Sequence, residues 1–108
     1  MKHDLKKRIE IHGNIESENK LGEKTFKYGL KKKLWAAIIP QTGALQRQQA
    51  ETILTNVTHK IIVRYSAGKE VTKEMKIYYK QHIFEIKYIL NPYESNEYLE
   101  IFVQEVLT

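Results

Sequence analysis

Residues 57–65 read Val-Thr-His-Lys-Ile-Ile-Val-Arg-Tyr and show the clearest structural pattern in the chain. Side chains that favour burial alternate with polar ones, which is the period of a β-strand with one buried face. The face expected to be buried carries Val57, His59, Ile61, Val63 and Tyr65. We therefore predict a strand over these residues, with His59 as a core or rim histidine that has a hydrogen-bond partner.

The same alternation, on either side of this stretch, predicts five more strands. They cover approximately residues 8–12, 26–39, 75–79, 84–90 and 99–106. The first ends at Gly13, whereas the second is long enough to bend, and Gly29 is a natural place for a bulge. Pro40 ends the second strand because proline has no N–H for the ladder. Six strands without βαβ spacing predict a mainly β protein, a small antiparallel β-barrel or sandwich.

Three polar stretches separate the predicted strands. Residues 14–24 and 66–74 are expected to be loops, and the first of them is expected to be a mobile hairpin loop. Residues 41–56 contain the one helical stretch, which is polar, weakly amphipathic and too short to persist without tertiary support. We expect a single domain over residues 1–108, with long mobile loops and one short helical insertion.

The composition excludes several classes of protein. The chain of 108 residues has no cysteine, which rules out disulfides, thiolate catalysis and cysteine-bound zinc. The longest uncharged apolar run, residues 34–40, is much shorter than the ~20 residues of a membrane span. The first residues are charged rather than apolar, so no secretory signal is expected. These features predict a soluble cytoplasmic protein without a membrane partner.

No group of residues points to catalysis. The three serines, Ser17, Ser66 and Ser95, fall in predicted loops and lack the Gly-x-Ser-x-Gly context of a nucleophile. No two of the four histidines are spaced as His-x-His or His-x-x-x-His, and no glycine-rich phosphate loop occurs. We predict no enzyme, no catalytic residue, no cofactor, no metal and no small-molecule substrate.

The net charge of +5 lies entirely in the first third of the chain. Residues 1–33 hold ten basic and five acidic side chains, whereas residues 34–108 hold eight of each. Clustered basic side chains can bind phosphate backbones or acidic protein surfaces, although lysines also keep exposed strands soluble. The candidates for a basic surface facing a partner or DNA are Lys6, Lys7, Arg8, Lys31, Lys32 and Lys33.

The seven tyrosines allow two interpretations. Aromatic rings can stack the bases of single-stranded nucleic acid. Tyr65, Tyr79 and Tyr88, however, lie on apolar faces, where packing at the core and rim explains them better. The tyrosines left for a binding or assembly surface, where this residue type is enriched, are Tyr78, Tyr93 and Tyr98.

Several blocks of sequence are distinctive because of their order and spacing. Residues 5–11 read Leu-Lys-Lys-Arg-Ile-Glu-Ile, and residues 34–40 read Leu-Trp-Ala-Ala-Ile-Ile-Pro. The later blocks are residues 48–51 with 58–65, then residues 75–79 with 83–86 and 91–92. The ordered set resembles the phage head–tail joining family, whose members are also called head-closure, stopper or head–tail adaptor proteins.

The resemblance implies a non-enzymatic virion structural protein of a tailed phage or prophage. Members of the family form a β-barrel-type subunit that assembles as a ring, closes the DNA-filled capsid and docks the tail. The implied partners are the portal-adaptor ring, tail proteins, further copies of the chain and packaged DNA. Assembly is expected in the bacterial host cytoplasm, and the final location is the head–tail connector. The implied assembly or channel segment contains Gln41, Gln46, Arg47, Gln48, Gln49 and Glu51.

Two other functions remain open from the sequence. A small OB-like β-barrel that binds single-stranded nucleic acid predicts binding with a steep salt dependence and loss of binding on Tyr→Ala changes. A barrel that binds a small molecule or a protein in an unrelated cellular process fits the strand pattern as well.

Overall fold

The computed structural model describes residues 4–41 and 57–106. The strands β1 to β6 span Lys7–Glu18, Lys24–Pro40, His59–Arg64, Lys76–Tyr79, His82–Leu90 and Tyr98–Val106. Two short helical elements are α2 (Tyr65–Gly68) and the 3-10 turn η1 (Pro92–Glu94). No helix in these two described ranges has the length and apolar character that crossing a membrane requires.

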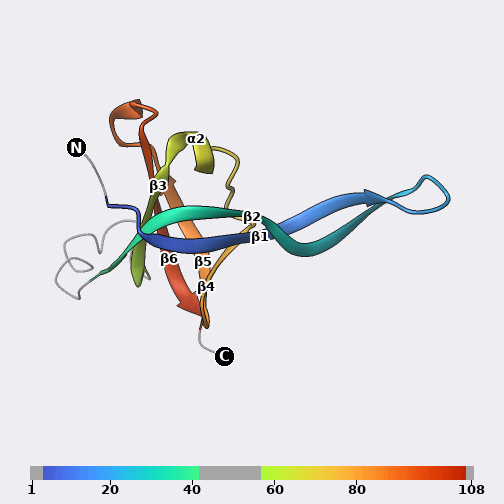
Figure 1. Ribbon diagram of the computed structural model, residues 1–108, viewed down its shortest axis with the longest axis horizontal. Coiled ribbons are helices and arrows are strands. Elements are labelled where there is room, and N and C mark those ends of the chain that lie inside the picture. Colours follow the sequence, from blue (N-terminus) through green and yellow to red (C-terminus); the bar gives the residue numbers. More distant parts are fainter. Residues whose placement is uncertain (1–3, 42–56, 107–108) are drawn as a thin grey trace.

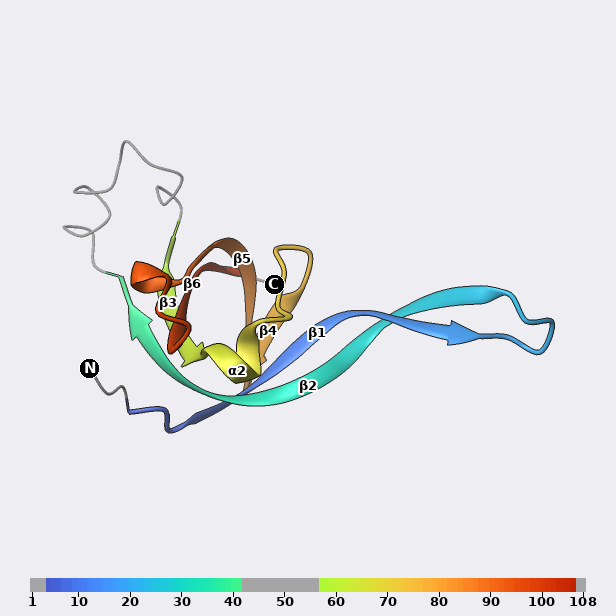
Figure 2. The same ribbon diagram turned by 90° about the horizontal axis from the view of Figure 1, so that it is seen from above.

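The six strands close into an antiparallel barrel in the order β1-β2-β3-β6-β5-β4, because β4 pairs back onto β1. Figures 1 and 2 show this ring of strands at one end of the molecule and a long β1–β2 hairpin that projects away from it. Closure removes the free strand edges that an open sheet would present. The prediction of a mainly β, six-stranded antiparallel fold is confirmed, and the architecture is a barrel.

Alternate side chains from all six strands fill the barrel. The most enclosed are Ile9, Ile11, Ala36, Ile61, Val63, Ile77, Phe84, Ile101 and Val103. Ile61 and Val63 come from the stretch with the clearest alternation, so its predicted buried face is confirmed. Burial of this apolar surface, at about 25 cal/mol per Å², is the main term that stabilises the barrel.

The turn α2 lies at one end of the barrel (Figure 1). Gly68 is buried there, and a Cβ at its position would lie 2.6 Å from Cγ2 of Val63. Nζ of Lys32 donates a hydrogen bond of 2.6 Å to the carbonyl oxygen of Ala67, which satisfies a carbonyl left unpaired at the end of the turn. The loop predicted over residues 66–74 therefore begins as a helical turn, because close packing on β3 stabilises it.

The loop predicted over residues 14–24 is largely wrong. β1 continues to Glu18 and β2 begins at Lys24, so only residues 19–23 form the connection. The extended part of this hairpin, residues 14–30, is called the arm below, and it contributes to the molecule's longest dimension of 54 Å. Its two strands are held by ladder hydrogen bonds and bury no face, so residues 14–24 form strands without the apolar alternation that marks the barrel strands.

The tip of the arm is a tight turn. The side-chain oxygen of Asn19 accepts hydrogen bonds from the backbone N–H groups of Leu21 (2.9 Å) and Glu23 (3.0 Å). Gly22 has a φ of +80°, a conformation that glycine adopts without a steric penalty. These contacts give the arm a defined end.

The bulge in β2 lies at Lys31 and not at the predicted Gly29. Ile11 pairs with Lys32 and His12 pairs with Leu30, so Lys31 is an extra residue in the ladder. A bulge shifts the two-residue alternation by one position. Leu30 and the residues of β2 before it therefore lie on the opposite face from the one that their spacing from Leu34 and Ala36 indicates.

Candidate assembly surface

The six basic candidates surround the base of the hairpin without forming one patch. Lys6 makes an exposed ion pair with Asp4 (3.1 Å). Nζ of Lys7 lies 5.9 Å from the ring centre of Tyr79, on β4. Such exposed contacts stabilise the fold very little, so both lysines are available to a partner.

The lysine run 31–33 is divided among three environments. Nζ of Lys31 donates to the carbonyl oxygen of Asn14 (3.1 Å) at the bulge. Lys32 is half-buried and bonded to Ala67 of α2, as described above. Lys33 is exposed on the outer face of β2. Lys32 therefore stabilises the barrel, whereas Lys33 points to solvent.

A row of arginine and aromatic side chains crosses the outer face of four strands. Arg8 of β1 pairs with Trp35 of β2, and its guanidinium lies 5.0 Å from the Trp35 ring. Arg64 of β3 pairs with Tyr98 of β6, and its guanidinium lies 5.9 Å from the Tyr98 ring. Since β2 pairs with β3, the two pairs lie side by side. We call these four residues the arginine–aromatic row.

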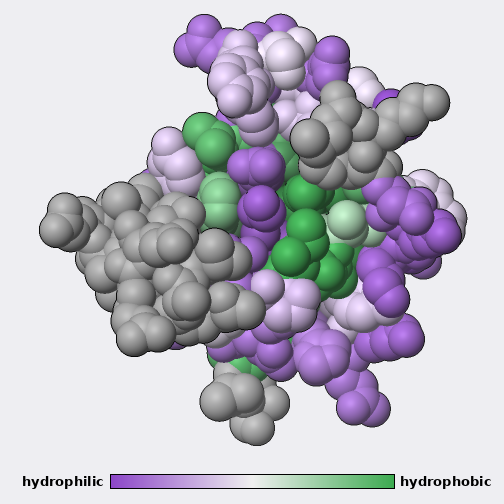
Figure 3. Space-filling view, turned by 90° about the vertical axis from the view of Figure 1, so that its left-hand side faces the viewer, coloured by the Kyte–Doolittle hydropathy of each residue, from purple (hydrophilic) through white to green (hydrophobic). Residues whose placement is uncertain are grey.

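A groove opens beside this row. It has a volume of about 290 Å³ and is lined by Leu5, Trp35, Arg64 and Ala67. Trp35 is 54% exposed, although its large aromatic ring would be stabilised by burial. Figure 3 views the end of the molecule away from the arm and shows apolar surface between hydrophilic side chains on that face. The groove combines apolar walls with a positive charge.

The sequence alone did not indicate that Trp35 and Arg64 lie together in one surface. Both occupy outward positions in the alternation of their strands, which was a usable signal. Their proximity depends on the register of β2 against β3, and register is not visible in the alternation of either strand alone.

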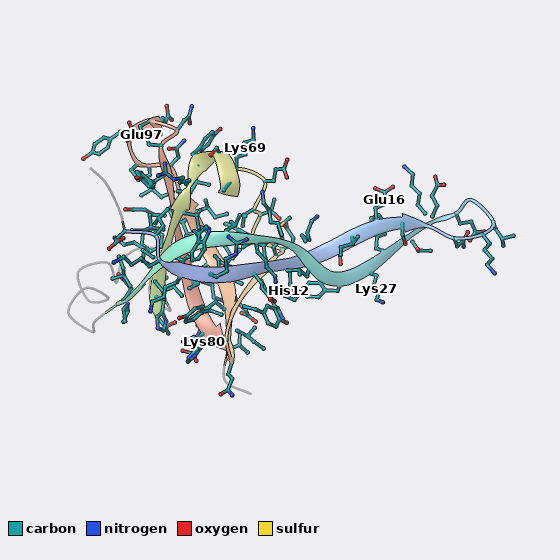
Figure 4. All side chains as sticks on the ribbon, in the orientation of Figure 1. His12, Glu16, Lys27, Lys69, Lys80 and Glu97 are labelled. Carbon is teal, nitrogen blue, oxygen red and sulfur yellow. The ribbon has the colours of Figure 1, made fainter. Side chains whose placement is uncertain are left out.

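The arm carries an exposed apolar face. Phe26, Tyr28 and Leu30 alternate along β2 and lie on one side of the hairpin, and Phe26 is 67% exposed. Glu16 pairs with Phe26 across the two strands and shares this side. Figure 4 shows Glu16 and Lys27 projecting from opposite sides of the arm, outside the barrel. One side of the arm is therefore apolar, with the carboxylates of Glu16 and Glu18 and the lysine Lys24 beside the apolar side chains.

Side chains at the base of the arm pack more closely. The ring of His12 lies 4.0 Å from the ring of Tyr78, and Nε2 of His12 lies 2.9 Å from the Glu10 carboxylate. Burial raises the pKa of Tyr28 above its usual value, and the nearby Tyr78 adds to the effect. Tyr78, which the sequence left without a packing role, supports the point where the arm leaves the barrel.

His59 is half-buried in the barrel wall. Its Nδ1 lies 2.9 Å from Oγ1 of Thr58, and this hydroxyl also accepts the backbone N–H of Glu105 (2.7 Å). Burial lowers the pKa of His59 below its usual value; the Glu105 carboxylate opposes this shift and His82 adds to it. The prediction of a rim histidine with a hydrogen-bond partner is confirmed.

Most of the predicted channel segment falls outside the described residues. Gln41 is described and half-buried, and its backbone N–H donates to the carbonyl oxygen of Thr58 (2.9 Å). Within residues 4–41 and 57–106, no group of three or more histidine, aspartate or glutamate side chains could hold a metal ion. The predicted positions outside the described residues are Gln46, Arg47, Gln48, Gln49 and Glu51.

The geometry defines a small barrel protein whose exposed side chains suit contacts with other macromolecules. Residues 2–106 match the phage head completion protein family. A protein of Shigella flexneri 2a, determined in solution, has the same fold with a TM-score of 0.70 and 19% identity, over 94% of this chain and 92% of that one. A chain in the virion of a native gene transfer agent particle has a TM-score of 0.61 and 17% identity, over 99% of this chain and 100% of that one. No curated protein matches the chain in sequence.

The family match covers nearly the whole chain, and the protein therefore belongs to the phage head completion protein family. The resemblance inferred from the ordered sequence blocks is confirmed. The protein is therefore a structural protein of the phage head.

Proposed function

We propose that the protein forms a ring in the head–tail connector of a tailed phage or prophage. The ring closes the DNA-filled capsid after packaging and docks the tail, and the protein has no enzymatic activity. The observation that carries the proposal is the match of residues 2–106 to a family that completes phage heads. The rigid barrel and the projecting arm support it, because a ring subunit needs a body and a means of reaching its neighbours.

Within the ring, residues 41–56 face the central channel or a neighbouring subunit. The basic side chains at the base of the hairpin face the portal-adaptor ring, the tail or DNA phosphates. Their exposure supports this role for Arg8 and Lys33, whereas the bond from Lys32 to α2 makes Lys32 the weakest candidate. Assembly takes place in the bacterial host cytoplasm, before the ring becomes part of the connector.

Capsids made without this protein test the proposal. Purified protein is added to DNA-filled capsids that lack it, and DNA retention and tail attachment are scored. We expect both to be restored, and capsids without added protein serve as the control. If the protein neither binds these capsids nor restores either property, the head-completion role is wrong.

A barrel that binds single-stranded nucleic acid remains the second candidate, because the arginine–aromatic row is a surface on which bases could stack. Titration of a fluorescent oligonucleotide at low salt tests it. Binding that weakens steeply with salt and is lost in Trp35→Ala would support this function. Absence of binding at low salt would exclude it.

A further inference from the structure

We propose that the arm of one subunit binds the barrel of a second copy of this chain, with Phe26 seated in the groove between Leu5, Trp35, Arg64 and Ala67. This inference rests on the proposed ring and names the contact that joins its subunits. Three properties of the described residues support it: the exposed apolar face of the arm, the opposite charges of arm and groove, and their positions at opposite ends of the molecule.

The apolar side chains of the arm do not stabilise its own barrel. Phe26 is 67% exposed, Tyr28 is 44% exposed and Leu30 is 42% exposed, and none belongs to the core cluster. Their two-residue spacing places all three on one side of the hairpin, and the bulge at Lys31 turns that side away from the face that carries Leu34 and Ala36. Adjacent exposed apolar side chains on one face are typical of a surface that another molecule covers.

The charges of arm and groove are complementary. Glu16 and Glu18 lie on the same side of the arm as Phe26 and share it with Lys24, so the strand residues of this side carry one net negative charge. The groove is lined by Arg64, and Arg8 stacks on the Trp35 ring at its edge. Glu16 forms an ion pair with Lys24 (3.2 Å) within the arm, and both side chains are more than half exposed. Replacing Lys24 by an arginine of the groove as the partner of Glu16 therefore costs little free energy.

The arm cannot reach the groove of its own subunit. Phe26 and Trp35 lie on the same extended strand, nine residues apart, which separates them by about 30 Å at the rise of a β-strand. The groove lies at the barrel end of the hairpin, beside the start of β1, and the arm points away from that end (Figure 1). A contact between two different surfaces of identical subunits is heterologous, and repetition of such a contact closes a ring when the rotation allows it.

Cross-linking tests this contact directly, because the chain contains no cysteine of its own. Phe26→Cys and Ala67→Cys are prepared as separate proteins, mixed, added to capsids that lack the protein, and treated with a short bismaleimide. We expect a cross-linked dimer that contains one copy of each variant, both on capsids and, at lower yield, in concentrated solution. Thr25→Cys is the matched control, because Thr25 is also exposed but faces the other side of the arm.

The outcomes separate the contact from the function. A yield with Phe26→Cys and Ala67→Cys several times that with Thr25→Cys and Ala67→Cys supports the arm-to-groove contact. Equal yields, or a product made only by Phe26→Cys with itself, overturn it. If wild-type protein restores DNA retention but this pair does not cross-link on the capsid, the contact is wrong and the proposed function stands. If wild-type protein restores nothing, the proposed function is wrong, and absence of the dimer in concentrated solution then overturns the contact as well.

Discussion

Single side chains determine how closely α2 packs on the barrel. Gly68 lets the backbone of α2 approach Val63 at a distance that excludes any side chain. His59, on the same strand as Val63, has a pKa below its usual value because its ring is half-buried. At these positions stability depends on a few atoms, and single substitutions measure it.

We expect Gly68→Ala to destabilise the protein by about 1 to 3 kcal/mol, because the added methyl group overlaps Cγ2 of Val63 and forces the backbone to shift. Urea unfolding followed by circular dichroism measures the loss. Gly29→Ala is the control, since its Cβ would meet only Cδ1 of Ile15 at 3.6 Å, an ordinary contact. Equal effects of the two substitutions would show that α2 tolerates displacement.

The protein is expected to lose stability as the pH falls through the range in which His59 titrates. Its pKa is lowered in the folded state, so below its usual value of 6.5 the unfolded chain binds a proton more readily than the folded one. The contribution is complete above that value and decreases as the pH falls towards the lower, folded pKa. Glu105 and His82 are the charged neighbours that modify it.

Unfolding free energies of the wild type and His59→Gln, measured from about pH 7.5 to about pH 5.5, test this expectation. The wild type should lose more stability than the variant over this range. Parallel curves for the two proteins would mean that His59 does not contribute to the pH dependence.

Among the elements, α2 depends on a neighbour, because it is too short to satisfy its own carbonyl groups. The hydrogen bond from Lys32 supplies the missing donor from β2. The bulge one residue before it has a second effect, since it turns the apolar side chains of the arm to the outer face of the hairpin. The lysine run 31–33 therefore links β2 to α2 through Lys32, and it marks the start of the arm through the bulge at Lys31.

We expect Lys32→Ala to lower the free energy of unfolding by about 1 kcal/mol, because it removes a donor from a part-buried carbonyl group. Lys33→Ala removes the same positive charge from the exposed outer face of β2 and should leave stability nearly unchanged. Urea unfolding of the two variants provides the comparison. A larger loss in Lys33→Ala would contradict the assignment of Lys32 to α2.

The whole molecule consists of a closed barrel, which contains the core, and an arm that buries almost nothing. In the proposed assembly, stability and subunit contact are thus carried by different parts. Such a division suits a virion protein that must stay folded while its exposed segment binds a neighbour.

Replacement of residues 15–27 by a two-residue Asn-Gly turn tests this division. The new turn would join Asn14 to Tyr28, which already face each other across the hairpin. We expect thermal unfolding to change by only a few degrees, because the core cluster loses no residue. Restoration of DNA retention in capsids that lack the protein should be lost. Full restoration by this variant would show that the arm is dispensable for assembly.

The alternation of apolar side chains was sufficient to predict the barrel strands and much of their buried face, because burial of one face imposes a period of two on the sequence. The ordered blocks were also sufficient to indicate the family. The arm and the bulge could not be predicted in the same way. An exposed hairpin is held by backbone hydrogen bonds, which do not require residues 14–24 to alternate in hydropathy, and a single extra residue at Lys31 reverses the faces of β2 on its two sides.

The arginine–aromatic row and its groove are products of tertiary structure alone. Arg8, Trp35, Arg64 and Tyr98 come from four strands, and strand order and register decide that they are neighbours. A strand's own sequence records which side of it is buried, but not which residue of another strand lies beside it. For this reason the buried interior of the protein can be predicted from its sequence, whereas its candidate binding surface forms only when the barrel closes.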